Sequence, residues 1–186
     1  RRYHGIDAAM KAARASYIAG VAATSNVLAG KRYGIPVAGT MAHSYVQAHE
    51  DEMEAFRAFA RVYPDTVLLI DTYDTLRTVR KVIDMAHALG GDFKVSGLRL
   101  DSGDLAALSR EARRMLDDAG LQRVQLVASG NLDEYRVAQL VGEGAPFDTF
   151  GVGTAMGVSS DAPSLDIAYK LAEYGGRGRV KLAKDK

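Results

Sequence analysis

The sequence contains no cysteine and no tryptophan, and only 4 prolines among its 186 residues. Without cysteine, a disulfide scaffold and thiolate metal sites are excluded, and the chain suits a reducing compartment. Basic and acidic residues nearly balance, 24 against 23, so no excess of charge favours nucleic acid or an anionic membrane. No apolar run approaches the roughly 20 residues that span a bilayer. We therefore expect a soluble, cytoplasmic protein whose partners are neither nucleic acids nor membranes.

The composition is otherwise that of a globular protein with one sizeable core, at 47% hydrophobic and 25% charged residues. Short apolar runs bounded by turn residues predict buried strands at residues 35–39, 66–71, 95–101, 124–129 and 147–153. Apolar residues at helical spacing predict helices at 6–19, 53–62, 76–86 and 105–116. This alternation indicates an α/β fold with parallel strands. A doubly wound sheet and a (β/α)8 barrel both fit, and both bind ligands at the carboxyl ends of the strands.

The two ends of the chain depart from this alternation. A helix-like stretch opens it, with neither an initial methionine nor a preceding strand. The glycine-rich residues 175–178 predict a hairpin turn between the flanking segments 164–174 and 179–184. Five strands cannot close an eight-stranded barrel. We therefore expect residues 1–186 to form one domain from the interior of a longer enzyme chain.

A polar or glycine residue ends each predicted strand, and these positions recur roughly every 30 residues, the length of a βα unit. They are Thr40, Asp71, Asp101, Ser129 and Gly153. Because the carboxyl ends of parallel strands meet at one edge of a sheet, we expect these residues to line a common site.

The segment GLRLDSGD, residues 97–104, crowds charged and polar side chains at one strand end. One residue among Asp101, Ser102 and Asp104 can cap the following helix. Arg99 shares a strand face with Asp101, so the two form either a structural ion pair or an anion site. The position at the ligand edge favours the anion site, and we expect Ser102 and Asp104 to bind substrate there. At the preceding strand end, Asp71 is the better binding residue and Asp74 the better helix cap.

His43 follows the first predicted strand, in the segment PVAGTMAHS, and would open onto the same edge as Asp71 and Asp101. An imidazole can transfer protons or phosphoryl groups near neutral pH. A lone histidine is more often structural, but its position here favours catalysis. No second histidine lies at metal-ligand spacing from it, so we predict no metal site built on histidine.

Glycine-containing turns follow the last two predicted strands, in SGN at residues 129–131 and GVGT at residues 151–154. Glycines at such turns free backbone N–H groups that can bind phosphate. We predict a phosphate site formed by Gly130, Asn131, Gly153 and Thr154, with Ser129 as a neighbouring substrate-binding residue.

Several long motifs together resemble the nicotinate phosphoribosyltransferase family in its bacterial form, across essentially the whole chain. They are RRYHGIDAA, TSNVLAG, GTMAHSYVQAHEDEMEAFRAFARVYP, LLIDTYDTL, LRLDSGDLAALS and FGVGTAMGVSSDAPSLDIAYKLAEY. The resemblance implies a type II phosphoribosyltransferase whose fold is part of an irregular TIM-like (β/α) barrel with a short C-terminal hairpin. That family's amino-terminal domain and remaining barrel strands are absent from this sequence.

The resemblance implies that nicotinate and 5-phosphoribosyl 1-diphosphate are converted to nicotinate mononucleotide and diphosphate, as in NAD salvage. It implies ATP as a co-substrate, Mg²⁺ as a cofactor, and His43 as the residue that is phosphorylated. Arg99 would then hold an anionic part of the substrate while Asp101 engages ribose hydroxyls. Ser25 would face the base, and Arg2 would meet anionic groups.

Three alternatives stay open. The chain could be a nicotinamide or a quinolinate phosphoribosyltransferase of the same fold, or an inactive piece that only binds phosphorylated metabolites. A homodimer is one possible assembly.

Overall fold

The computed structural model describes residues 4–159, 161 and 169–182. They divide into two compact units. The larger unit runs from Thr40 to Gly151, without residues 131–133, and includes residues 169–182; the smaller unit holds the other described residues. No helix among the described residues is long and apolar enough to cross a membrane.

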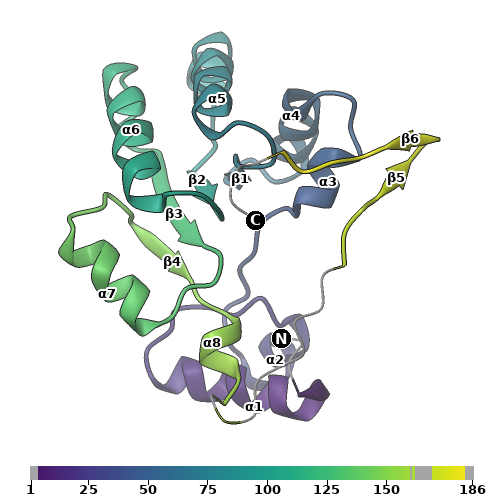
Figure 1. Ribbon diagram of the computed structural model, residues 1–186, viewed down its shortest axis with the longest axis vertical. Helices are drawn as coiled ribbons and strands as arrows, with labels where there is room; N and C mark the ends of the chain where they lie inside the picture. The colour runs from purple at the N-terminus through teal and green to yellow at the C-terminus, as the bar shows by residue number, and fades with distance from the viewer. Residues whose placement is uncertain (1–3, 160, 162–168, 183–186) are drawn as a thin grey trace. The chain divides into compact units, whose positions relative to one another are not determined.

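The larger unit alternates strands and helices along the chain (Figure 1). Its elements are α3 (His43–Gln47), α4 (Glu52–Val62), β1 (Val67–Leu69), α5 (Thr75–Leu89), the 3₁₀ helix η1 (Gly90–Asp92), β2 (Gly97–Leu100), α6 (Leu105–Asp118), β3 (Gln125–Ser129), α7 (Glu134–Gly142), β4 (Thr149–Gly151), β5 (Glu173–Tyr174) and β6 (Arg177–Gly178).

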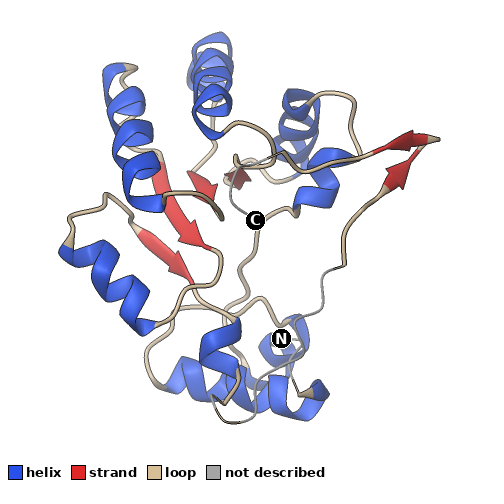
Figure 2. Cartoon of the chain, viewed as in Figure 1, coloured by secondary structure: helices blue, strands red, loops and turns tan. Residues whose placement is uncertain are grey.

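The first four strands form one parallel sheet in the order β1-β2-β3-β4 (Figure 2). Each crossover helix, α5, α6 or α7, therefore leads to the next strand along, and the order never reverses. Because parallel crossovers are right-handed, three steps in the same direction place all three helices on one face of the sheet. Among the described strands there is thus no reversal of the doubly wound kind.

The core of this unit lies between the sheet and its helices. Leu68, Leu98 and Leu126 stand in register across three strands and are fully buried. Val79 of α5 and Leu116 of α6 are fully buried as well. Alternation along β2 turns Arg99 to the opposite face from Leu98, which leaves its guanidinium available to the polar edge.

Four of the five predicted strands and all four predicted helices are confirmed, but the strand predicted at residues 35–39 is wrong. Val37 forms only an isolated parallel bridge with Thr24. Pro36 has no N–H group to extend a ladder; its carbonyl accepts a hydrogen bond from the Thr24 N–H. Local apolar character predicted an extended segment correctly, but not a partner for it.

The C-terminal hairpin is confirmed in a shorter form. β5 and β6 pair antiparallel around a two-residue turn, Gly175–Gly176, in which both φ angles are positive, 60° and 72°. A two-residue hairpin turn with positive φ at both positions requires such glycines. Arg177 and Gly178, predicted within the turn, instead form β6. Parts of the predicted flanking segments, residues 164–168 and 183–184, lie outside the described residues.

The smaller unit contains α1 (Gly5–Ile18), α2 (Val27–Tyr33) and α8 (Thr154–Gly157). The Asn26 side chain caps α2 by accepting a hydrogen bond from the Ala29 N–H at 3.1 Å. Gly30 of α2 packs so closely against Val37 that a Cβ atom there would overlap the valine side chain. The glycine of the TSNVLAG motif therefore has a packing role.

Candidate active site

The site lies at the carboxyl edge of the sheet in the larger unit. Asp71 follows β1, Asp101 directly follows β2, and Ser129 is the last residue of β3. His43 is the first residue of α3. Because strand ends of a parallel sheet share one edge, residues far apart in the sequence meet here.

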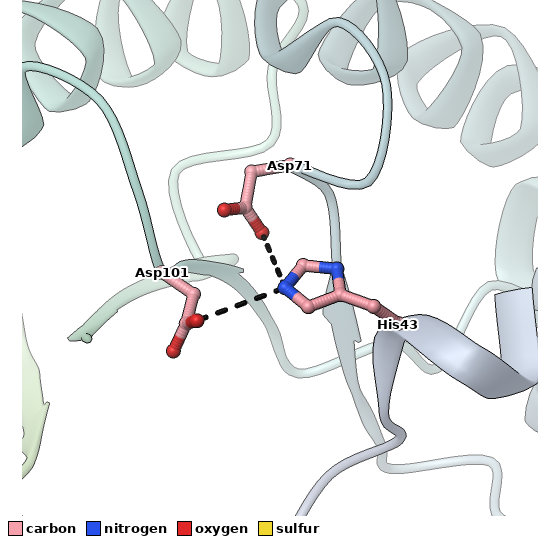
Figure 3. A group of neighbouring side chains, drawn as sticks. All are labelled: His43, Asp71 and Asp101. Atoms are coloured by element: carbon pink, nitrogen blue, oxygen red, sulfur yellow. Dashed lines mark ion pairs between the residues drawn. The ribbon is translucent and has the colours of Figure 1, made fainter. Parts of the chain in front are cut away.

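His43 lies between two carboxylates (Figure 3). Its Nε2 atom is 3.8 Å from Asp71 Oδ1 and 3.6 Å from Asp101 Oδ2. Its Nδ1 atom is 3.0 Å from Thr72 Oγ1. Within the described part of the chain, Nε2 and Asp71 Oδ1 are buried and have no hydrogen-bond partner. Buried polar atoms are nearly always satisfied, so this pair marks a place built for a function or a ligand.

Asp71 has no exposed surface. Its Oδ2 atom accepts a short hydrogen bond from Ser102 Oγ and lies 3.5 Å from Lys181 Nζ. Lys181 also donates to Ser102 Oγ at 3.2 Å. A charged carboxylate that is wholly removed from water needs such partners.

Arg99 organises the other half of the cluster through three hydrogen bonds of 2.7 Å. Nε donates to Ser129 Oγ, Nη1 to Thr40 Oγ1 and Nη2 to Asp101 Oδ1. Ser129 Oγ in turn donates to Asp101 Oδ1 at 2.7 Å. Arg99 and Asp101 therefore form an ion pair that is locked by two hydroxyl groups.

Comparison with known proteins identifies the family to which this chain belongs. The model of the nicotinate phosphoribosyltransferase (NAPRTase) family matches residues 3–183. The chain belongs to the nicotinate phosphoribosyltransferase family.

Relatives from two bacteria are similar over nearly the whole chain. The chain is 58% identical over 186 residues to nicotinate phosphoribosyltransferase pncB2 of Mycobacterium tuberculosis, covering 100% of the chain and 40% of that protein. It is 48% identical over 181 residues to nicotinate phosphoribosyltransferase of Bacillus subtilis, covering 97% of the chain and 37% of that protein. The chain therefore spans about 40% of the length of these relatives.

A solved structure supports the fold. The crystal structure of nicotinate phosphoribosyltransferase from Vibrio cholerae superposes with a TM-score of 0.80 at 18% identity, covering 99% of this chain and 48% of that one. The parallel sheet and its crossover helices are thus shared with a structure whose sequence has diverged far from this one.

The structure brings together seven of the fourteen residues predicted for the site in this nicotinate phosphoribosyltransferase family member. Contacts connect His43, Thr40, Asp71, Arg99, Asp101, Ser102 and Ser129. Of the two interpretations of Arg99 and Asp101, the structure shows the ion pair; contact with a substrate anion stays a prediction.

Of the other predicted residues, Asp104 and Gly130 lie in the larger unit. Asp104 is exposed and caps α6, since its Oδ1 accepts a hydrogen bond from the Ala107 N–H at 3.0 Å. Gly130 packs against the Asp101 backbone. Residues Ser25, Asn131, Gly153 and Thr154 belong to the smaller unit, and Arg2 lies outside the described residues. Their binding roles stay predictions.

Sequence reasoning missed Thr72 and Lys181. Thr72 follows Asp71 in the sequence, and its hydroxyl contacts the His43 ring. Lys181 stands in the sequence RVKLAK, which was predicted only as one side of the hairpin. No local signal links this lysine to Asp71, because the contact depends on how the C-terminal segment folds back.

The cluster also includes a group that could hold a metal ion. Ligand atoms of His43, Asp71 and Asp101 all lie within 4.8 Å of one another. The group contains no second histidine, so the spacing of histidines in the sequence does not predict it. Besides His43, the group consists of the Asp71 and Asp101 carboxylates, which follow neighbouring strands.

Proposed function

We propose that this chain carries the catalytic centre of a nicotinate phosphoribosyltransferase that couples its reaction to ATP hydrolysis. Its substrates would be nicotinate, 5-phosphoribosyl 1-diphosphate and ATP. Membership of the family supports the reaction, and the ring of His43 between two carboxylates is the observation that carries the proposal. A sheet whose strand order never reverses supports a TIM-like barrel in the whole protein.

His43 is proposed to accept the γ-phosphoryl group of ATP. A lone pair of the imidazole forms a bond to the γ-phosphorus while the bond to the bridging oxygen breaks, and ADP leaves with that electron pair. The ring then loses the proton from its other nitrogen to a neighbouring acceptor. Asp71 or Asp101, beside Nε2, can take this proton when the bond to phosphorus forms at Nδ1, where the Thr72 hydroxyl is a hydrogen-bond partner and not a base. Water would later hydrolyse the phosphohistidine.

In the second reaction, the ring nitrogen of nicotinate forms a bond to the anomeric carbon of the ribose. The bond from that carbon to the diphosphate oxygen breaks, and diphosphate leaves with the electron pair. Positive charge develops on the sugar as this bond breaks, and a nearby carboxylate such as Asp101 stabilises it. Arg99 has five N–H donors, so after its three protein bonds it can still donate to a substrate anion.

Mg²⁺ fits the carboxylate pair of the site. Magnesium prefers oxygen ligands and is usually held by one or two carboxylates together with substrate phosphates. Asp71 Oδ1 is a buried oxygen without a hydrogen-bond partner in the described structure, and Asp101 lies across the same ring. These two residues would hold the ion. When bound, the ion would neutralise negative charge on the diphosphate.

Mass spectrometry of the full-length protein after incubation with ATP tests the proposal. We expect phosphate on His43 in the unaltered protein and none in His43→Ala, which should also lose ATP coupling but keep some uncoupled transfer. His87→Ala is the matched control, because His87 is exposed on α5 and only contacts the Ala119 carbonyl at 3.3 Å. Unchanged ATP hydrolysis in His43→Ala would contradict the proposal.

A further inference from the structure

Lys181 contacts the buried carboxylate that faces the histidine ring. Its Nζ atom lies 3.5 Å from Asp71 Oδ2 and 3.2 Å from Ser102 Oγ. Only 12% of its side chain is exposed. Surface lysines normally keep the ammonium group in water, so a lysine held inside a polar cluster has a specific partner there. That partner is Asp71.

The chain segment that carries Lys181 is fixed next to the site. The backbone N–H of Leu182 donates to the Thr72 carbonyl at 3.0 Å, and the hydroxyl of the same threonine meets the His43 ring. Lys181 therefore reaches Asp71 from a backbone that is hydrogen-bonded to the residue following Asp71. This hydrogen bond holds the backbone on which Lys181 stands next to Asp71.

The hairpin that precedes Lys181 is anchored as well. Arg177 Nη1 and Arg179 Nη2 bind the two oxygens of Glu50 at 2.6 and 3.0 Å, and Arg179 Nη1 donates to the His49 carbonyl at 3.2 Å. Both acceptors lie in the loop between α3 and α4, and α3 begins with His43. The hairpin is thus attached to the helix that carries the histidine.

Each carboxylate beside His43 has its own cation. Arg99 pairs with Asp101 at 2.7 Å, and Lys181 pairs with Asp71. A buried carboxylate that loses its cation is strongly destabilised, and its uncompensated charge would repel an incoming phosphate group. The two ion pairs allow two carboxylates to stand beside one ring and still tolerate an anionic substrate.

Lys181 and Ser102 also determine the orientation of the Asp71 carboxylate. Both contact Oδ2, so the other oxygen, Oδ1, faces His43 Nε2. The terminal torsion of an aspartate has broad minima, so without these two contacts the carboxylate could rotate away from the ring.

We propose that Lys181 is a positioning residue that holds the Asp71 carboxylate toward His43. The effect on turnover rests on the proposed function, because Lys181 acts on the phosphoryl-transfer step through Asp71. The interaction between Lys181 and Asp71 itself does not depend on that function. It can therefore be measured separately.

Steady-state kinetics of the full-length protein, with Lys181→Met, Lys181→Arg and Lys94→Met, test the effect on turnover. For Lys181→Met we expect kcat of the ATP-coupled reaction to fall about 10- to 100-fold, with the KM for nicotinate changed by less than about twofold. Lys181→Arg keeps the cation and should recover most of the activity. Lys94 is exposed just before β2, away from the carboxyl edge, so Lys94→Met should match the unaltered protein.

A double-mutant cycle with Asp71→Asn shows whether Lys181 acts through Asp71. In the Asp71→Asn background, Lys181→Met should cause no further loss of kcat, and the effects of the two changes on the unfolding free energy should be non-additive. A repeated loss of kcat in that background, or a Lys181→Met protein with more than about half the normal kcat, would overturn the proposal.

The same cycle separates this inference from the proposed function. If the unaltered full-length protein forms no nicotinate mononucleotide, the proposed function fails, and the unfolding measurements then decide alone. Coupling between Lys181 and Asp71 in those measurements would support the positioning role, whereas additive effects would exclude it.

Discussion

Gly130 lies so close to the backbone of Asp101 that no side chain fits between them. A Cβ atom at Gly130 would overlap the Asp101 carbonyl oxygen and stand 2.9 Å from its carbonyl carbon. The φ angle of Gly130 is +88°, a conformation that residues with a side chain rarely adopt. The glycine after β3 therefore fixes the backbone of the carboxylate after β2.

Gly130→Ala should destabilise the fold by about 2 to 4 kcal/mol, because positive-φ strain adds to the overlap with Asp101. Chemical denaturation measures the loss. Gly120→Ala is the matched control: its φ is +74°, but nothing lies within 4 Å of a Cβ atom there, so only the strain, about 1 kcal/mol, should remain. Equal losses in the two variants would show that the contact with Asp101 has no energetic effect.

The edge where the site lies was predictable from the sequence, because it follows from a repeat. Strand ends that recur once per βα unit must meet at one edge, so Asp71 and Asp101 could be placed together without any knowledge of side-chain contacts. The helix caps were predictable for the same kind of local reason. Asp74 Oδ1 accepts the Arg77 N–H at 2.9 Å, as an N-cap does.

The contacts that complete the site could not be predicted, because they join residues that lie far apart in the sequence and no local pattern links them. Ser129 was predicted to bind substrate, and its hydroxyl donates to Asp101 and accepts from Arg99 in the structure. Lys181 reaches Asp71 only because a hairpin folds back. Periodicity determines which residues share an edge, whereas partners within that edge depend on three-dimensional packing.

Asp101→Asn should reduce turnover far more than stability. The change keeps the shape of the side chain but removes the charge beside His43 and the ion pair with Arg99, so we expect kcat to fall about 100-fold or more. Asp74→Ala should lower stability and leave turnover unchanged, because losing the α5 cap costs about 1 kcal/mol and leaves the site intact. Activity assays and thermal unfolding of both variants check this contrast; parallel losses of activity and stability in Asp101→Asn would indicate a structural role.

Glu50 should make attachment of the hairpin depend on pH. A hydrogen bond from Arg179, together with the charges of Arg179 and Arg177, lowers the pKa of Glu50 below its usual value of 4.5. A carboxylate with a lowered pKa in the folded state stabilises that state above its unfolded pKa, and this contribution is lost as the pH falls through the folded pKa. The contribution is small, because Glu50 is exposed to water.

The Tm of Glu50→Gln should therefore lie slightly below that of the unaltered protein at pH 7. This difference in Tm should shrink as the pH falls below 4.5, and it should vanish at pH values below the lowered pKa of Glu50. Glu173→Gln, an exposed change on β5 of the same hairpin, should show no such difference. A difference between Glu50→Gln and the unaltered protein that stays constant with pH would contradict the role of the ion pairs.

We predict that Ser25 contributes to the choice of base. It is exposed in the smaller unit, between Thr24, which bridges to Val37, and Asn26, which caps α2. Nicotinate carries a carboxylate, so a pocket that accepts it should avoid a fixed negative charge and offer hydroxyl or cationic donors. A serine meets that requirement. The alternative is that Ser25 only turns the chain between the bridge and the helix.

Ser25→Asp in the full-length protein should weaken the use of nicotinate by about 1 to 3 kcal/mol in transition-state binding, with less effect on nicotinamide. The added carboxylate repels the acid, whereas it can accept a hydrogen bond from the amide N–H of nicotinamide. Ser25→Ala is the matched control, since it removes the hydroxyl without adding charge and should affect the two bases similarly. The measurement is kcat/KM for each base, and an equal loss on both in Ser25→Asp would show that Ser25 acts only on the turn.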